Sequence, residues 1–349
     1  MTELLKDILG QPAQFKKALA YHQGNQYSEI KKASDAIGKA SQVLIIGIGA
    51  SYTAGISIMH ALKKHEVFCS LIDASELENM EIFPPNSIAM ILSRSGKSIE
   101  IVKSADICKR HKIPTIAITN DTQSPLAQNV DIVVSAAVKF DHAVSISTYS
   151  SLILVGGLIT TFKEYGKHMA DIIQRLIGAC DYIEKYQLEW QKRIELSIMK
   201  QEALPVFFLG RSESYASARA GRLLWAEVAK SQSSCFATGN FRHGPQEMLS
   251  KKCKIVIWLS DHYSLNNDIK LISDMIRVGT DVSVITSQKQ IGPDVDTYIV
   301  PAVPEEFQAA FNCTPVQMMA EALSRKLGVD CDSFVFCNFI VTSLSLIHI

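Results

Sequence analysis

The stretch from Leu223 to Leu249 carries the residues best suited to proton transfer. Glu227 lies among apolar residues at helical spacing, so the sequence predicts a carboxylate on a largely buried helix face. His243 follows 16 residues later, beside a glycine and a proline. A carboxylate and an imidazole are the side chains most easily tuned for acid–base catalysis near neutral pH. A structural role is the alternative, with Glu227 paired to Arg222 or Lys230 and His243 capping a turn.

Hydroxyl-rich loops follow three strands that the sequence predicts in its first half. They are Gly49-Ala50-Ser51, Ser93-Arg94-Ser95-Gly96-Lys97-Ser98, and residues 145–148 with Ser147 and Thr148. Ligands bind at the carboxyl ends of parallel strands, where helix N-termini offer free N–H groups. Hydroxyls, two cations and a glycine that allows close backbone approach suit an oxyanion such as phosphate. Serine also caps helices, so ordinary N-caps are the competing interpretation.

These loops belong to a pattern that the chain repeats. VLIIGIGASYTAGISIMHAL (43–62) aligns with VFFLGRSESYASARAGRLLW (206–225) at a constant offset of 163, and later strands recur in the same order. Continuous apolar strands alternating with helices predict parallel sheets covered on both faces. We therefore expect an α/β fold of two tandem doubly wound, flavodoxin-like domains with helical N-terminal and linking segments.

The expected segments are a helical N-terminus (1–35), a first domain with the hydroxyl-rich loops (36–165), a helical linker (166–200) and a second domain with Glu227 and His243 (201–345). Pro12 is expected to interrupt the first helix, with a second helix beginning at Phe15. The last seven residues, SLSLIHI, match no element and are expected to be a truncated or foreign end.

Composition excludes several classes of function. The formal net charge is zero, so no general attraction to nucleic acid or to an anionic membrane is expected. The eight cysteines are scattered without metal-ligand spacing, and no GxGxxG motif with a downstream acid is present, so we expect no metal and no cofactor. No run reaches 18 apolar residues, which favours a soluble, cytoplasmic protein.

The motifs together resemble the SIS (sugar isomerase) domain proteins. Specifically, they resemble the tandem-domain group that contains the isomerase half of glucosamine-6-phosphate synthase and the fructosamine-6-phosphate deglycases. Gly49-Ala50-Ser51-Tyr52 resembles the first loop of that family, residues 93–98 resemble its phosphate loop, and Arg242-His243-Gly244-Pro245 resembles its HGP turn. The spacing of Glu227 and His243 equals that of the catalytic pair of the family.

The resemblance implies roles for particular residues. Glu227 and His243 would be catalytic. Substrate or phosphate binding would fall to Gly49, Ala50, Ser51, Ser93, Arg94, Ser95, Ser98, Ser147, Thr148 and Glu247. Glu247 is equally consistent with a surface acid. The family further implies a sugar phosphate as ligand and a homodimer or higher homo-oligomer, with His243 crossing to the site of the neighbouring copy.

Departures from the family narrow the expected reaction. The lysine with which the synthase attacks its keto sugar corresponds to Phe339, and no lysine follows Lys326. No glutamine-hydrolysing domain precedes the SIS-like region, so a glutamine-dependent reaction is not expected. We favour a deglycase or deaminase that cleaves the C–N bond of a ketosamine 6-phosphate by general acid/base catalysis. An aldose–ketose isomerase and a non-catalytic phosphosugar-binding regulator are the alternatives.

Overall fold

The computed structural model describes residues 1–200, 205–260, 264–288, 295–336 and 340–342. Phe339 and the terminal SLSLIHI, on which the sequence made predictions, lie outside the described residues.

The first sheet is parallel and five-stranded, in the order β2-β1-β3-β4-β5. Its strands are β1 (Gln42–Gly47), β2 (Cys69–Asp73), β3 (Ser87–Ser93), β4 (Thr115–Thr119) and β5 (Ile132–Ser135). The predicted apolar runs form β1, β3, β4 and β5, and β3 is buried at every position. The sequence did not predict β2, because this edge strand is half-buried throughout and has no continuous apolar run.

The second sheet repeats this arrangement, in the order β10-β9-β8-β6-β7. Its strands are β6 (Val206–Gly210), β7 (Ser233–Ala237), β8 (Lys254–Leu259), β9 (Asp281–Thr286) and β10 (Asp296–Ile299). Strand β7 is again a half-buried edge strand that the sequence did not reveal. Each sheet has the 2-1-3-4-5 order of doubly wound folds, which confirms the α/β prediction.

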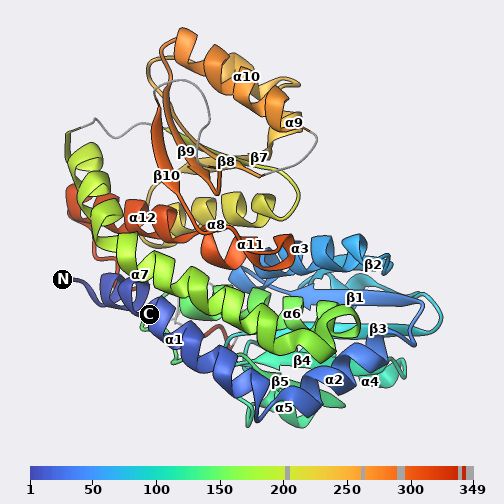
Figure 1. Cartoon of the computed structure of the whole chain (residues 1–349). Helices are drawn as coiled ribbons and strands as arrows, with labels where there is room; N and C mark the ends of the chain where they lie inside the picture. The colour runs from blue at the N-terminus through green and yellow to red at the C-terminus, as the bar shows by residue number, and fades with distance from the viewer. Residues whose placement is uncertain (201–204, 261–263, 289–294, 337–339, 343–349) are drawn as a thin grey trace.

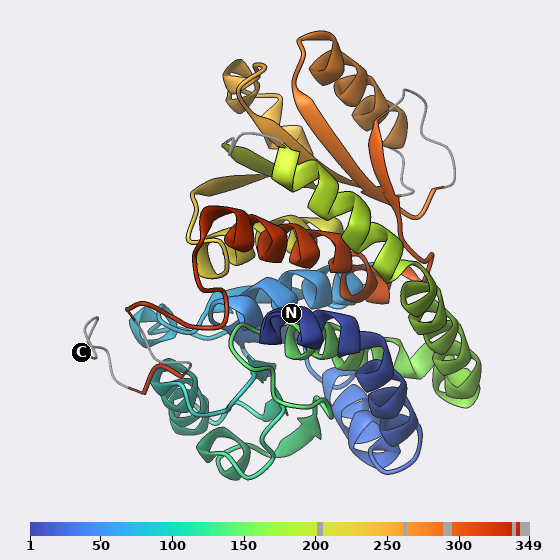
Figure 2. The ribbon, with the colours of Figure 1, turned by 90° about the vertical axis from the view of Figure 1, so that its left-hand side faces the viewer.

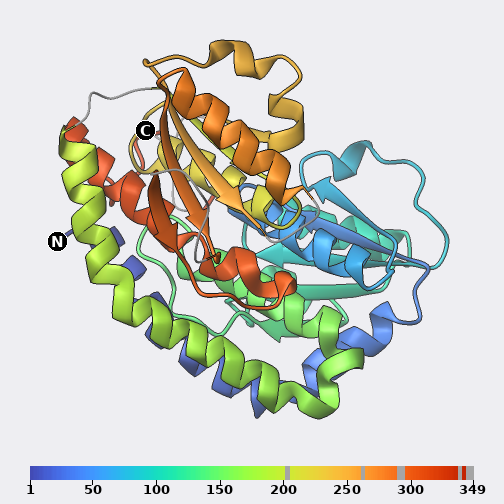
Figure 3. The ribbon, with the colours of Figure 1, turned by 45° about the horizontal axis from the view of Figure 1, so that its top comes forward.

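Helices cover both sheets and join them. They are α1 (Glu3–Gln23), α2 (Tyr27–Ile37), α3 (Ala50–Lys64), α4 (Ile99–Arg110), α5 (Pro125–Gln128), α6 (Ser147–Tyr165), α7 (Met169–Lys200), α8 (Ser214–Glu227), α9 (Thr238–Phe241), α10 (Leu265–Arg277), α11 (Glu305–Phe311) and α12 (Thr314–Leu327), with 3-10 turns η1 (Leu77–Asn79), η2 (Gly166–His168) and η3 (Pro245–Met248). Figure 1 shows α3, α8 and α11 between the two sheets. The long helix α7 runs along the outside from the first sheet to the second, beside α1 (Figures 2 and 3). Among the described residues, no helix has the length and apolarity needed to cross a membrane.

Pro12 does not break the first helix, contrary to the prediction. Helix α1 continues through it and ends at Gln23. A proline removes the N–H that would bond the carbonyl four residues earlier, here that of Ile8. The side-chain amide of Gln11 donates to this carbonyl instead and also donates to Gln317 of α12 at 2.6 Å. The replacement hydrogen bond and the contact with α12 allow the helix to continue.

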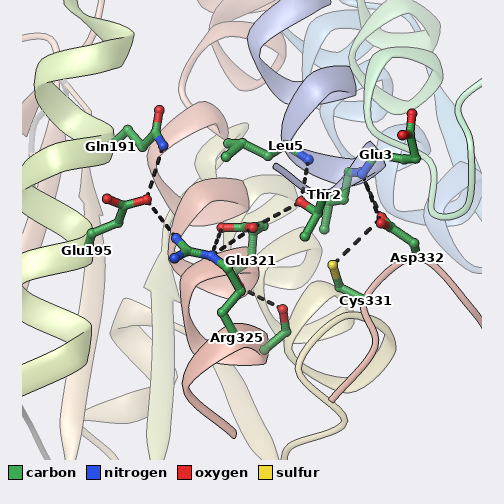
Figure 4. A network of polar contacts seen from close by, with 11 residues as sticks. Thr2, Glu3, Leu5, Gln191, Glu195, Glu321, Arg325, Cys331 and Asp332 are labelled. Atoms are coloured by element: carbon green, nitrogen blue, oxygen red, sulfur yellow. Dashed lines mark hydrogen bonds and ion pairs between the residues drawn. The ribbon is translucent and has the colours of Figure 1, made fainter. Parts of the chain in front are cut away.

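Polar contacts tie the start of the chain to its last helix (Figure 4). Glu321 of α12 is buried and accepts from the Thr2 hydroxyl at 3.0 Å and from Arg325, which also bonds Glu195 of α7. The carboxylate of Asp332 accepts from the N–H groups of Glu3 and Leu4, each at 2.8 Å. Asp332 therefore caps α1 and holds the segment that follows α12 against it.

This cap generates a stability prediction. Asp332→Ala leaves two N–H groups of the first turn of α1 without a carboxylate, so we expect a loss of about 1 kcal/mol of unfolding free energy. Urea unfolding of the variant and of wild type measures the difference. Asp171→Ala, which removes an exposed carboxylate from the first turn of α7, is the control and should change stability less. Equal effects would show that Asp332 is not a significant cap.

Candidate active site

A cavity of about 230 Å³ opens at the carboxyl ends of β1 and β3. This is the point in the first sheet where the strand order reverses, which is the usual ligand site of such folds. Its predicted lining residues are Gly49, Ala50, Ser51, Ser93, Arg94, Ser95, Ser98 and Glu227, and Glu100, Ser145, Phe334 and Val341 also border it. The structure therefore brings two of the hydroxyl-rich loops and the candidate base together in one cavity.

The loop after β3 is shaped by its own serines. Gly96 has a φ of +63°, and a Cβ there would lie 2.0 Å from the Ser124 hydroxyl, so only glycine fits. The Ser93 hydroxyl accepts from the Gly96 N–H at 2.9 Å, and the Ser95 hydroxyl accepts from the Lys97 N–H at 3.2 Å. A hydroxyl that accepts such a bond still has a proton to donate to an anion.

Ser98 occupies the N-cap position of α4, but its hydroxyl makes no capping hydrogen bond. It borders the cavity instead, at the positive end of the helix dipole. The cap alternative raised from the sequence therefore does not describe this hydroxyl. The sequence predicts that Lys97 is a second cation of the anion site. Lys97 is instead exposed, pairs with Asp121 at 2.8 Å and does not line the cavity.

Arg94 is the cation that enters the cavity. Its guanidinium donates to the Ala143 carbonyl at 2.5 Å and lies 4.9 Å from the ring centroid of Phe140. Burial lowers the pKa of Arg94, and the negative charges of Asp141 and Glu227 oppose this shift. The arrangement holds a positive charge beside the serines, where it can attract a phosphate.

Glu227 is the last residue of α8 and reaches the cavity from the second half of the chain. Burial raises the pKa of its carboxyl from 4.5 to about 7, while Arg94, Lys230 and Arg222 act to lower it. Apolar neighbours that include Leu223 and Leu224 lie beside the carboxyl and explain the desolvation. Lys230, one partner considered from the sequence, donates to the backbone carbonyl of Glu227.

His243 does not lie in this cavity. Residues 238–240 belong to the short helix α9, and the backbone N–H groups of Arg242 and His243 close one turn onto the carbonyls of Gly239 and Asn240. His243 follows this helix with an exposed side chain, and Glu247 is exposed in η3. Within one chain the structure therefore does not bring His243 or Glu247 to Glu227.

Ser147 and Thr148 are fully buried at the start of α6 and do not line the cavity. Their backbone N–H groups donate to the carboxylate of Asp141 at 2.7 and 3.0 Å. This carboxylate already binds N–H groups at the N-terminus of α6 that could otherwise bind a phosphate. Of the third predicted loop, only Ser145 borders the cavity.

The tail after α12 supplies lining residues that the sequence did not reveal. Phe334 and Val341 border the cavity, and the Val341 carbonyl accepts from the N–H of Ile99, in the first turn of α4. Lys230 donates to the Ser333 carbonyl at 2.8 Å, which holds the tail near Glu227. Nothing in the composition of residues 333–342 distinguishes them as part of a site.

Residues 36–160 match the family model described as the SIS domain. This chain contains a SIS domain. It is also 23% identical over 336 residues to the glutamine–fructose-6-phosphate aminotransferase (isomerizing) of Pyrobaculum aerophilum, with 94% of this chain and 55% of that protein aligned. The chain thus spans about half the length of the curated relatives it matches.

Solved structures share the fold of the SIS domain and of the rest of the chain. The C-terminal domain of glucosamine-fructose-6-phosphate aminotransferase from Francisella tularensis has a TM-score of 0.85 at 18% identity, covering 95% of this chain and 98% of that one. Glucosamine-6-phosphate deaminase from Thermotoga maritima has a TM-score of 0.78 at 19% identity, covering 97% and 99%. Tagatose-6-phosphate ketose/aldose isomerase from Escherichia coli has a TM-score of 0.79 at 18% identity, covering 96% of each chain.

The raised pKa of Glu227 predicts a pH dependence of stability. The unfolded chain loses this proton near pH 4.5 and the folded chain near pH 7, so stability falls as pH rises through this window and levels off above it. Glu227→Gln removes the titrating group, so its stability advantage over wild type should grow from pH 4.5 to pH 7. Thermal unfolding across this range measures the difference, with Glu81→Gln in an exposed loop as the control. A constant difference between Glu227→Gln and wild type would contradict the shift.

Proposed function

We propose that this chain is an enzyme that acts on a phosphorylated sugar and cleaves the C–N bond of a ketosamine 6-phosphate. The carrying observation is the Glu227 carboxyl, with a pKa of about 7, in a cavity lined by serine hydroxyls and Arg94. A base with this pKa is half ionised at neutral pH and can both take and return a proton. The deaminase and isomerase activities named for the structural neighbours support the same class of reaction.

The reaction follows from one base and one acid. The phosphate lies against Ser51, Ser95 and Ser98, with Arg94 neutralising its charge. Glu227 removes a proton from the amine-bearing carbon next to the keto carbon, and an acid protonates the keto oxygen, which forms an enaminol. Return of the proton from Glu227 to the former keto carbon, with loss of the nitrogen proton to the conjugate base of the acid, gives an imine. Water adds to the imine, the C–N bond breaks, and aldose phosphate and free amine leave.

We assign the acid to His243 of a second copy of the chain. The exposed position of His243 beyond α9 supports this assignment, because the side chain is free to enter a neighbouring site in a symmetric dimer. Glu247 lies in the same exposed segment and would enter with it, to hold the substrate amine or a hydroxyl. The dimer thus completes a site that one chain leaves without its acid.

An aldose–ketose isomerase is the second candidate, because transfer of a proton through an enediol needs the same base and acid and no imine hydrolysis. The isomerase among the structural neighbours favours it. A purely regulatory phosphosugar-binding protein would gain nothing from a carboxyl with a pKa of about 7 in its binding site, so the pKa of Glu227 argues against that alternative.

Separate variants test the base and the acid. Glu227→Gln and His243→Ala should each lower kcat by about 100-fold or more and leave sugar-phosphate binding nearly intact. If His243 acts across a dimer, mixed dimers of the two variants contain one intact site, and co-refolding them should restore about a quarter of wild-type activity. Steady-state kinetics and calorimetry measure both effects. Full activity of Glu227→Gln would show that Glu227 is not the base. If the mixed dimers regained no activity, His243 of a second copy would not be the acid.

The choice of reaction is tested by substrate. Fructose 6-phosphate and fructoselysine 6-phosphate are offered to the same preparation, and free amine and aldose phosphate are followed. We expect amine and aldose phosphate in equal amounts from the adduct, at a rate that rises with pH through about 7 as Glu227 ionises. Interconversion of unsubstituted hexose phosphates with no release of amine would assign the chain as an isomerase. Turnover of neither compound, with both binding, would favour the regulatory alternative.

A further inference from the structure

The second sheet has a cavity of its own at its carboxyl edge. It measures about 190 Å³ and lies at the carboxyl ends of β8 and β9, with Glu213, the residue before α8, in its wall. Its polar lining includes Glu213, Ser260, Ser287, Glu305, Gln308 and Asn312. We call it the second crevice, and the mechanism above does not use it.

The two crevices are built by the same turn. A Cβ on Gly210 would lie 2.4 Å from the Ser214 carbonyl oxygen, and a Cβ on Gly47 would lie 2.8 Å from the Tyr52 nitrogen. Each strand therefore enters its helix through an equally tight bend that only glycine allows. At the offset of 163 that relates the repeats, Glu213 of the second crevice takes the place of Ala50 in the first.

Glu213 changes what this position can bind. Its side chain is 2% exposed, and the hydroxyls of Ser214 and Ser260 donate to its Oε1 at 3.0 and 2.6 Å. Within the described part of the chain, Oε2 accepts no hydrogen bond from another side chain. The carboxylate sits at the N-terminus of α8, where the helix dipole would otherwise attract an external anion.

Among the described residues, the second crevice therefore lacks the cation that the first contains. The first cavity contains Arg94, whereas no described lining residue of the second is a lysine or an arginine. Glu305 adds a second carboxylate at the exposed rim, 3.2 Å from Lys64 of α3. Such a cavity repels a phosphate and favours a ligand that donates hydrogen bonds and carries positive charge.

We propose that the second crevice binds a small polyhydroxylated amine in its ammonium form, with the ammonium group donating to Oε2 of Glu213 and hydroxyl groups meeting the polar lining. A buried carboxylate in the wall of the crevice is the feature that selects an amine over a neutral sugar. Burial raises the pKa of Glu213, and a bound ammonium ion would act in the opposite direction by stabilising its charged form. This site does not depend on the function proposed for the first cavity.

The test uses glucosamine as the cationic probe and glucose as the matched neutral probe, each titrated calorimetrically at pH 7. Wild type should bind glucosamine about tenfold or more tightly than glucose. Glu213→Gln keeps the size of the side chain and an oxygen for both serines, and should abolish the preference. Glu305→Gln, a change at the exposed rim that should not disturb folding, should reduce it by a smaller factor. Glu227→Gln should leave it unchanged.

Three outcomes would overturn the proposal. Equal affinity for the two probes, or no binding of either to wild type, would leave Glu213 only as the hydrogen-bond partner of Ser214 and Ser260. Loss of glucosamine binding in Glu227→Gln but not in Glu213→Gln would place the amine in the first cavity. Absence of turnover, which would contradict the proposed function, leaves each of these binding results interpretable.

Discussion

The packing of α8 against α3 is the contact on which the candidate site depends. Helix α8 follows β6 of the second sheet, yet its last residue, Glu227, lines the cavity of the first. The two helices contact each other between the sheets, where the guanidinium of Arg219 on α8 lies 5.5 Å from the ring centroid of Tyr52 on α3. Neither repeat alone contains both the base and the hydroxyl-rich loops, so the site exists only because the repeats pack together.

The same packing sets the chemistry of Glu227. Small and apolar residues of the two helices, among them Ala50 and Leu224, line a narrow pocket together with Glu227 and reduce the access of water to it. Desolvation favours the neutral acid, and nearby Arg94 only partly compensates, which leaves the pKa near the pH at which a general base is useful. A buried carboxyl of this kind destabilises the fold at neutral pH, and the role of general base that we propose for Glu227 would account for that cost.

The two crevices show how one backbone design can present different charges. Both form at the carboxyl edge of a parallel sheet, and each has in its wall the start of a helix that follows a tight glycine turn. In the first, serines and Arg94 leave the helix end for an anion. In the second, the carboxylate of Glu213 precedes the helix and accepts from the hydroxyls of Ser214 and Ser260. The lining side chains, and not the backbone, decide which ligand each crevice accepts.

The sequence by itself determined the strands that are buried on both faces, the repeat, the glycine of the phosphate-like loop and the helical position of Glu227. These features depend on local periodicity or on a single backbone angle, such as the positive φ of Gly96. Edge strands β2 and β7 escaped prediction because half-buried residues carry no such signal. The continuity of α1 through Pro12 depends on a side chain that replaces the lost hydrogen bond, which periodicity does not show.

Only the tertiary structure decided which polar groups of these loops face the cavity. Arg94 enters it whereas Lys97 pairs with Asp121, although the two cations stand three residues apart in one loop. Asp141 binds the N–H groups at the N-terminus of α6 that could otherwise bind a phosphate. The tail after α12 places Phe334 and Val341 beside the cavity, although they lie far along the chain from the other lining residues. In each case residues that are distant in sequence decide which groups face the cavity, because the energy of a polar group depends on what surrounds it after folding.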